Sequence, residues 1–108
     1  MMALRFIVKG QLIKKDPSSP FSRLVAGTSN YYYADFALDP AWNGYACVAR
    51  FTTSGATAHV PIKNGRANIP DEIMKYKEIR VSLIGKKGDT KLVTNETTVY
   101  QSGGIANG

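Results

Sequence analysis

The chain has 108 residues, of which 44% are hydrophobic and 20% are charged, and its formal net charge is +6. This length suits one domain, and the composition excludes an intrinsically disordered chain, which combines low hydrophobicity with high charge. The single cysteine, Cys47, excludes an internal disulfide, and together with the single histidine it cannot supply a zinc site of four protein ligands.

The first third of the chain has the pattern of strands. Residues 3–10 form a short β-branched and aromatic run that ends at Gly10, resumes over 11–15 and stops at the breaker cluster 16–20. Residues 28–38 then alternate in character, so successive side chains point to opposite sides of a strand. The face expected in the core carries Tyr32, Ala34, Phe36 and Leu38. Tyr31 and Tyr33 lie on the other face.

The only tryptophan, Trp42, precedes an Asn43-Gly44 turn and the predicted strand 45–53. An arginine is rarely buried without a partner, so Arg50 is expected to face outward. The face predicted to point inward carries Cys47, Ala49 and Phe51. Because Trp42 lies between two strands, we expect its side chain to close one end of the core over Phe36 and Phe51.

Residues 56–70 have the pattern of two strands joined at Asn64-Gly65, the pair that a type I′ hairpin turn prefers. Pro61 lacks a backbone N–H, so the first of these strands is expected either at a sheet edge or with its proline at a position that needs no ladder hydrogen bond. The pattern therefore predicts a β-hairpin.

Residues 69–77 contain the only predicted helix. Pro70 suits a first helical turn, and the acidic Asp71 and Glu72 that follow are favourable near a helix N-terminus. We expect a helix of one or two turns near residues 70–76.

The last third predicts more strands. Residues 78–95 should form a strand with Ile79, Val81 and Leu83 on one face, a hairpin loop from Gly85 to Gly88, and a returning strand. A final strand is expected over 96–101. Residues 103–108 are polar and glycine-rich, which predicts a flexible tail or linker.

Together these elements predict an all-β fold, an antiparallel β-sandwich of about seven or eight short strands with at most one short helix near 70–76. The lack of crossover helices excludes a parallel βαβ fold. Residues 1–102 are expected to form a single β-sandwich domain, with 103–108 as the tail. The predicted structural core residues are Phe36, Trp42, Gly44, Phe51, Ile69 and Pro70.

Residues suited to catalysis are few. His59 lies in a predicted strand between two apolar residues, where a histidine is more often a spacer than a base. Cys47 is predicted to face inward, and a thiol in apolar surroundings has a raised pKa and behaves as a small hydrophobe. No spacing among the acidic residues favours a glycosidase pair. We therefore predict a protein that is not an enzyme, without catalytic residues, metal or cofactor, and a small hydrolase is the third alternative.

The candidate binding residues are Tyr31, Tyr33 and Arg50. Clustered tyrosines can bind sugars or stack on bases, and neighbouring cations can bind single-stranded nucleic acid. Strand propensity also explains the tyrosines. The 14 lysines and arginines are spread along the chain and form no single basic arm, which disfavours nucleic acid as the partner.

Four segments of the chain, taken in order, carry a resemblance to a known domain. They are FALDPAWNGYACVARF (36–51), VPIKNGRANIPDEIM (60–74), IRVSLIG (79–85) and KLVTNETTVYQSGG (91–104). The residues that match in order are Phe36, Trp42, Gly44, Ala49, Phe51, Ile69, Pro70, Glu72, Gly85, Thr94 and Asn95. The chain resembles the small β-sandwich of upper baseplate and tail or head-fibre proteins of phages that infect Gram-positive bacteria, and residues 1–35 are only loosely similar.

The resemblance implies a non-enzymatic virion structural protein, a fibre, baseplate or decoration component. Such a protein acts as an attachment or assembly module through contacts with other phage structural proteins. It implies location in the virion after assembly in the host cytoplasm, a homo-oligomer such as a trimer, and no membrane. The alternative is a small basic β-domain that binds an anionic polymer, either nucleic acid or a cell-wall polymer.

Overall fold

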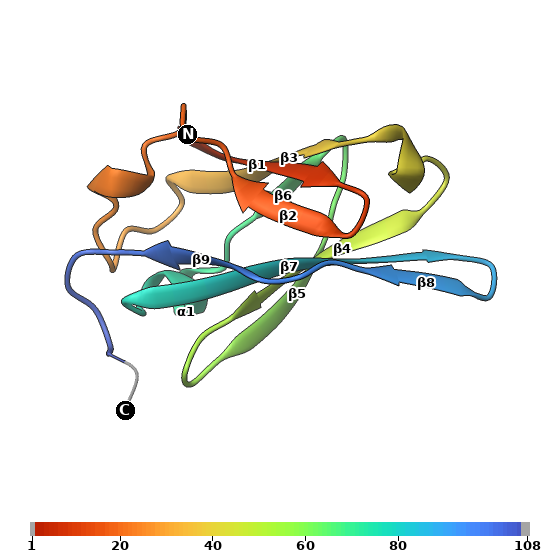
Figure 1. Cartoon of the computed structure of the whole chain (residues 1–108). Coiled ribbons are helices and arrows are strands. Elements are labelled where there is room, and N and C mark those ends of the chain that lie inside the picture. The colour runs from red at the N-terminus through yellow and green to blue at the C-terminus, as the bar shows by residue number, and fades with distance from the viewer. Residues whose placement is uncertain (1, 107–108) are drawn as a thin grey trace.

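The computed structural model describes residues 2–106 of the chain, and within them nine strands form two facing sheets (Figure 1). The strands are β1 (Met2–Lys9), β2 (Leu12–Lys15), β3 (Tyr32–Leu38), β4 (Ala46–Thr52), β5 (Thr57–Pro61), β6 (Arg66–Asn68), β7 (Glu78–Lys87), β8 (Thr90–Val93) and β9 (Thr97–Tyr100). The helices are the one-turn α1 (Asp71–Met74) and the 3-10 turns η1 (Phe21–Arg23) and η2 (Pro40–Trp42).

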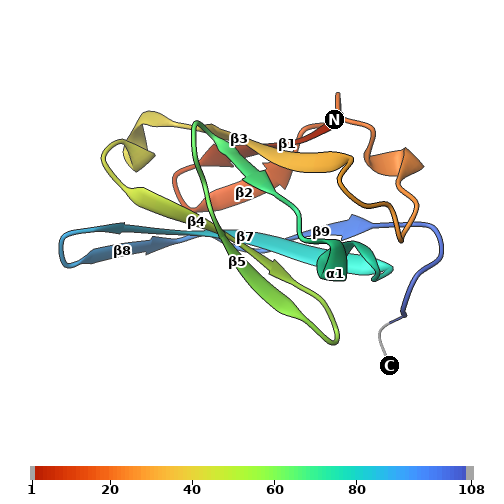
Figure 2. The ribbon, with the colours of Figure 1, turned by 180° about the vertical axis from the view of Figure 1, so that it is seen from behind.

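The two sheets are the two layers of a sandwich. The four-stranded sheet has the order β2-β1-β3-β6, and the five-stranded sheet has the order β5-β4-β7-β8, with β9 also paired to β7. Figure 2 shows the same two layers from behind, with α1 at the end where β7 begins. The predicted all-β sandwich is confirmed, and α1 lies where the short helix was expected.

One strand pair departs from the antiparallel prediction. Strands β1 and β3 run parallel, with Phe6 opposite Phe36 and their rings stacked 5.3 Å apart. Parallel neighbours need a crossover connection of about a dozen residues or more. Here residues 10–31, which contain β2 and η1, provide it without a crossover helix.

The turn at Asn64-Gly65 forms as predicted, but the hairpin does not extend beyond it. Both residues have positive φ, 53° and 76°, and Lys63 and Arg66 exchange backbone hydrogen bonds of 2.9 and 3.0 Å. Beyond the turn, β5 pairs with β4 and β6 pairs with β3, so the two strands enter different sheets. Strand β5 lies at a sheet edge, one of the two alternatives expected from Pro61.

The predicted loop from Gly85 to Gly88 is also shorter than expected. Strand β7 continues through Lys87, and the chain turns at Gly88, whose φ is +58°. Gly85 is therefore a strand residue in the middle of the β7–β8 pairing, opposite Leu92.

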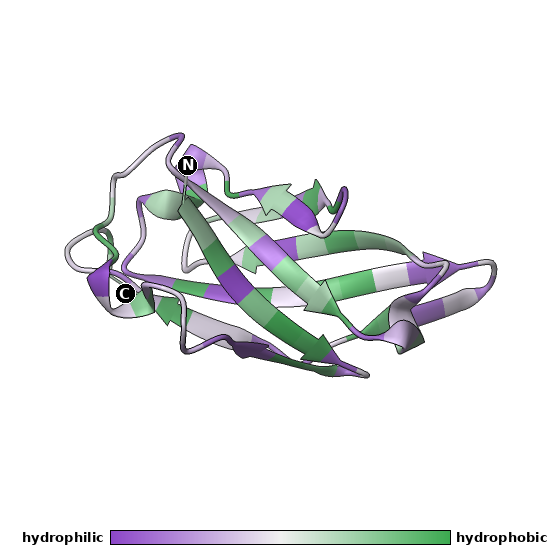
Figure 3. Ribbon diagram, turned by 90° about the horizontal axis from the view of Figure 1, so that it is seen from above, coloured by the Kyte–Doolittle hydropathy of each residue, from purple (hydrophilic) through white to green (hydrophobic). Residues whose placement is uncertain are grey.

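Strand alternation identified the core correctly. Ala34, Phe36, Ala49 and Phe51 are buried between the sheets, as are the inward residues of β7, and Figure 3 shows hydrophobic and hydrophilic residues alternating along strands. The buried core residues of β7 are Ile79, Val81 and Leu83. Burial of these side chains from both sheets is the main stabilising contribution to a sandwich.

Two of the six predicted core residues are not in the core. Phe36, Trp42, Phe51 and Ile69 are buried in the hydrophobic core. Gly44 is exposed and has a φ of +82°, so it is needed for the turn before β4. Pro70 is half-buried at the N-terminal end of α1, where its carbonyl accepts from the N–H of Ile73.

Trp42 closes one end of the sandwich. Its side chain is 3% exposed, its Nε1 donates to the Gly10 carbonyl at 2.8 Å, and its ring packs against Gly85 of β7. Asp39 accepts from the N–H of the same Gly10 at 2.9 Å. The segment between β3 and β4 therefore holds the β1–β2 turn against the five-stranded sheet.

Thr94 and Asn95 close one side of the sandwich. The Thr94 hydroxyl accepts from the N–H of Leu83 at 2.9 Å, where β7 passes from β8 to β9. The Asn95 side chain accepts from the N–H of Ile13 at 2.8 Å and donates to the Ile13 carbonyl at 3.4 Å. One side-chain amide thus pairs with β2 as a neighbouring strand would, and joins the two sheets.

The start of the expected tail is hydrogen-bonded to the rest of the protein. Ile105 donates to the Lys75 carbonyl and accepts from the N–H of Lys77, both at 2.9 Å. A Cβ on Gly104, whose φ is +85°, would lie 2.6 Å from the Cβ of Ala26. Backbone contacts therefore continue past residue 103 to Ile105, and residues 107 and 108 of the predicted tail lie outside the described residues.

Substitution Trp42→Ala should lower the free energy of unfolding by about 3–5 kcal/mol, because it removes a buried aromatic side chain. Denaturant unfolding followed by circular dichroism measures this. As a paired test, Gly85→Ala would place a Cβ 2.7 Å from Cζ3 of Trp42 and should destabilise the native chain. In the Trp42→Ala background the same change should cost much less, and strictly additive effects would contradict the contact.

Substitution Asn95→Ala should lower the free energy of unfolding by about 1–3 kcal/mol, because it leaves both backbone groups of Ile13 without their partner. The Asn95→Asp variant keeps an acceptor for the N–H and loses the donor to the carbonyl, so an intermediate loss is expected. Thermal unfolding of the three proteins gives the order, and an unchanged midpoint for Asn95→Ala would show that the amide does not hold β2.

Candidate functional site

The two residues best suited to nucleophilic catalysis lie on opposite faces of the five-stranded sheet. His59 is exposed and lies opposite Arg50, whereas Cys47 has the same strand parity as the buried Ala49 and Phe51. The Cys47 Sγ donates to the Tyr45 carbonyl at 3.5 Å, and burial raises the pKa of its thiol. A Cys–His pair requires both side chains on one side of the sheet, so these two residues do not form one.

Residues 2–106 contain neither a metal-ligating cluster nor a helix that could span a membrane. In this range no group of three or more histidine, cysteine, aspartate or glutamate side chains is placed to hold a metal ion. None of the helices in the same range has the length and apolar character needed to cross a membrane.

The three candidate binding residues do not come together. Tyr33 lies on the outer face of the four-stranded sheet, where the guanidinium of Arg66 sits 4.9 Å from the ring centre. Tyr31 precedes β3, is 47% exposed and contacts the edge of the Tyr32 ring. Arg50 projects from the outer face of the other sheet, since its neighbours in β4 point into the core. The tyrosines and Arg50 therefore cannot form one contact surface.

The outer face of the four-stranded sheet has a charge-paired part. Asp35 lies opposite Arg5 on β1 and opposite Arg66 on β6, and the Arg5 Nε is 3.9 Å from its carboxylate. Because Asp35 sits between two arginines, its carboxylate offsets one of their two positive charges.

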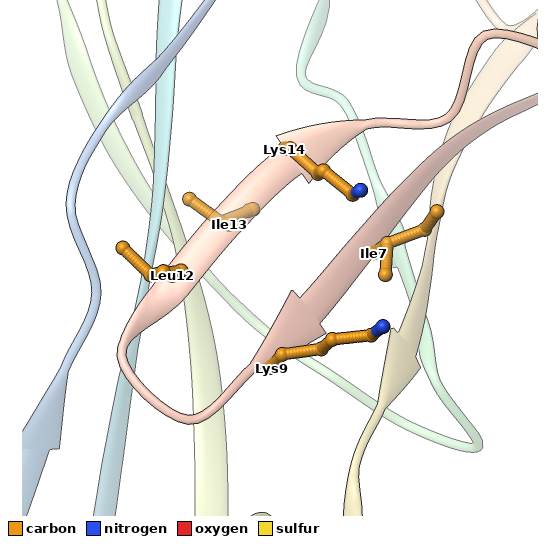
Figure 4. Close-up of a pocket in the computed structure, with 5 residues that line it drawn as sticks. All are labelled: Ile7, Lys9, Leu12, Ile13 and Lys14. Atoms are coloured by element: carbon orange, nitrogen blue, oxygen red, sulfur yellow. The ribbon is translucent and has the colours of Figure 1, made fainter.

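A shallow pocket of about 280 Å³ lies on the same sheet at the β1–β2 hairpin (Figure 4). Lys9 and Lys14 extend from neighbouring strands on the side where Ile7 lies, and Leu12 is 68% exposed. The pocket is lined by Ile7, Lys9, Leu12, Ile13 and Lys14. Its two ammonium groups beside apolar side chains suit a small anionic group, although the pocket is partly open to solvent.

The outer face of the five-stranded sheet has a continuous line of apolar residues. Val48 of β4 lies opposite Pro61 of β5 on one side and Ile84 of β7 on the other, and Ile84 lies opposite Val93 of β8. Residues directly opposite in an antiparallel pair share a face, so these four form one row across four strands, here named the apolar row. Pro61 and Val93 are exposed, and Val48 and Ile84 are half-buried.

Positively charged residues border the apolar row on both sides. Arg50 is two residues from Val48 along β4 and lies opposite His59 and Ser82, and these three residues are here named the arginine row. On the other side of the apolar row, Lys86 is two residues from Ile84 along β7. It lies opposite Ala46 and Lys91, and these three residues are here named the lysine row. A two-residue step along a strand is about 7 Å, so each row lies roughly that far from the apolar row.

Comparison of the chain with protein-family models, curated proteins and solved structures finds no match in any of the three.

The apolar row was missed by the sequence analysis, although its signal is visible in retrospect. Val48 alternates with Cys47 and Ala49, whose side chains are predicted to point inward, and Pro61 favours an edge strand. Ile84 alternates with the buried Leu83, which also predicts an outward side chain. The row becomes apparent only from the register between strands, which aligns residues that are up to 45 positions apart in the chain, from Val48 to Val93.

Alkylation of Cys47 tests the separation of the thiol from His59. Because burial raises the thiol pKa, the thiolate fraction near neutral pH is lower than that of a free cysteine. The reaction with iodoacetamide should therefore be slower than for free cysteine, and it should accelerate as the pH is raised. His59→Ala should leave the rate unchanged, whereas a clear slowing by His59→Ala would indicate a Cys–His pair.

Proposed function

We propose that this protein is a non-enzymatic structural component of a phage particle, a fibre, baseplate or decoration protein that works through protein–protein contacts. The observation that carries the proposal is the apolar row, a line of exposed and half-buried apolar side chains across an outer sheet face. Exposed apolar surface rimmed by polar residues is typical of protein interaction sites. The resemblance to phage baseplate and fibre domains supplies the class of particle, and other phage structural proteins are the proposed partners.

The residues that carry the resemblance bear on which kind of domain this is, and they say less about which partner it binds. Trp42 and Gly85 pack against each other, and Thr94 and Asn95 join strands through their side chains. These residues are therefore explained by folding, and a homo-oligomer such as a trimer is proposed from the resemblance alone.

Mass spectrometry of purified particles from the phage or prophage that encodes the chain tests the proposal. The protein should be present in the particles at an amount comparable to other structural proteins, because an assembly module remains in the product. Its abundance in the producing cells is the control. Absence from the particles, with abundant protein in the cells, would contradict a virion role.

Binding to an anionic polymer is the second candidate, and the net charge of +6 favours it. Contacts with phosphates release counterions, so such binding weakens steeply as salt increases. A monomer that binds DNA or wall polymer at low salt and releases it at physiological salt would favour this function over assembly. Apolar contacts between proteins should change far less over the same range.

A further inference from the structure

The outer face of the five-stranded sheet has a shape that limits what can cover it. Neighbouring strands are about 4.8 Å apart, so the apolar row, which crosses four strands, is roughly 14 Å long. The arginine row and the lysine row run beside it, each about 7 Å away. The surface is therefore an apolar stripe with a positively charged border on both long sides.

Within residues 2–106, cations outnumber carboxylates on the strands of this face. Arg50, Arg80, Lys86 and Lys91 occupy outward positions on its strands. Among the outward positions of these strands Glu78 is the one carboxylate, and it is three rows from Ile84, about 20 Å along β7. On the other sheet, by contrast, Asp35 lies between two arginines.

A second copy of the chain is a poor occupant of this face. In a two-fold contact the same patch meets itself, so with the apolar rows aligned each cation row would lie over a cation row. Like charges brought together in an interface cost free energy, and cations covered without partners cost more. An occupant must therefore supply carboxylates on both sides of its apolar residues.

Nucleic acid also fits this face poorly. Its phosphates would cover the apolar row, and binding of a single strand usually stacks successive bases on several aromatic rings. The tyrosine on this face, Tyr100, lies opposite Glu78 and therefore far from the apolar row, so His59 is a single ring beside that row. Tyr31 and Tyr33 belong to β3 and to the segment before it, in the other sheet.

We propose that this face is the docking surface for an acidic amphipathic helix of a different protein. The helix lies along the apolar row, with its apolar side chains over Val48 and Ile84 and carboxylates on its two flanks meeting Arg50 and Lys91. A helix is about 10–12 Å wide with its side chains, which brings its flanks over both cation rows. This inference rests on the proposed function, and it names the chemistry of the partner.

The test uses the full chain and a labelled synthetic helix of about 14 residues, roughly 21 Å long, with a leucine stripe bordered on both sides by glutamates. Fluorescence anisotropy at physiological salt measures binding. Lys91→Glu and Arg50→Glu should each weaken binding about tenfold, since they reverse charges that meet the carboxylates. Val93→Ser should weaken helix binding by shortening the apolar row, and Ile84→Ser should weaken it by interrupting the row. Because Val93 is exposed, the Val93→Ser variant keeps the test valid if Ile84→Ser unfolds the protein.

Lys14→Glu is the matched control, because it makes the same charge change at an exposed outward strand position on the opposite face. It should leave binding nearly unchanged. Four results would each overturn the proposal: no binding of the helix, equal weakening by Lys14→Glu and Lys91→Glu, equal binding of a helix with lysines in place of glutamates, or displacement of the helix by an oligothymidylate at the same salt.

The outcome is separable from that of the proposed function. Presence in phage particles together with a negative helix experiment would overturn the docking surface and leave the virion role intact. Helix binding by a chain that is absent from particles would overturn the virion role and leave the docking surface intact.

Discussion

The architecture depends on the indole of Trp42, which joins the two sheets at one end. Its N–H donates a hydrogen bond to the Gly10 carbonyl at the β1–β2 turn, and its ring packs so close to Gly85 that a Cβ on that residue would have no room. Gly10 lies in the turn that joins β1 and β2 of the four-stranded sheet, and Gly85 lies in a central strand of the five-stranded sheet. Because the ring replaces a side chain at Gly85, the position requires glycine, which explains why a strand interior contains a residue with low strand propensity.

Polar side chains complete the closure elsewhere. Asn95 pairs with Ile13 on β2, and the buried Gln101 donates to the carbonyls of Met74 and Tyr76 near α1. Asn95 thereby gives partners to backbone groups of Ile13, and Gln101 does so for the Tyr76 carbonyl and adds a second donor to the Met74 carbonyl, which also accepts from the N–H of Gly27. The sandwich is thus closed at its ends and along one side by hydrogen bonds from side chains to the backbone. This closure leaves both outer sheet faces as free surface.

The sequence predicted the core well because alternation is a local property. Ala34, Phe36, Ala49 and Phe51 could be assigned from the residues beside them. Strand pairing could not be assigned in this way, since alternation carries no information about the neighbour. The parallel pairing of β1 with β3 illustrates the limit, as does the Asn64-Gly65 turn, which is determined locally although its flanking strands belong to different sheets.

The same limit explains why the candidate site differed from the sequence prediction. Tyr31 and Tyr33 are candidates from sequence because they lie close together in the chain. By contrast, each residue of the apolar row has the pattern of an ordinary outward-facing strand residue, and these residues are Val48, Pro61, Ile84 and Val93. Register makes these four a row, and it also separates Arg50 from the tyrosines by the whole thickness of the sandwich. On a sandwich face, an interaction surface runs across strands, perpendicular to the chain. Its residues are therefore distributed through the sequence at intervals set by strand and loop lengths, and no short motif can contain them.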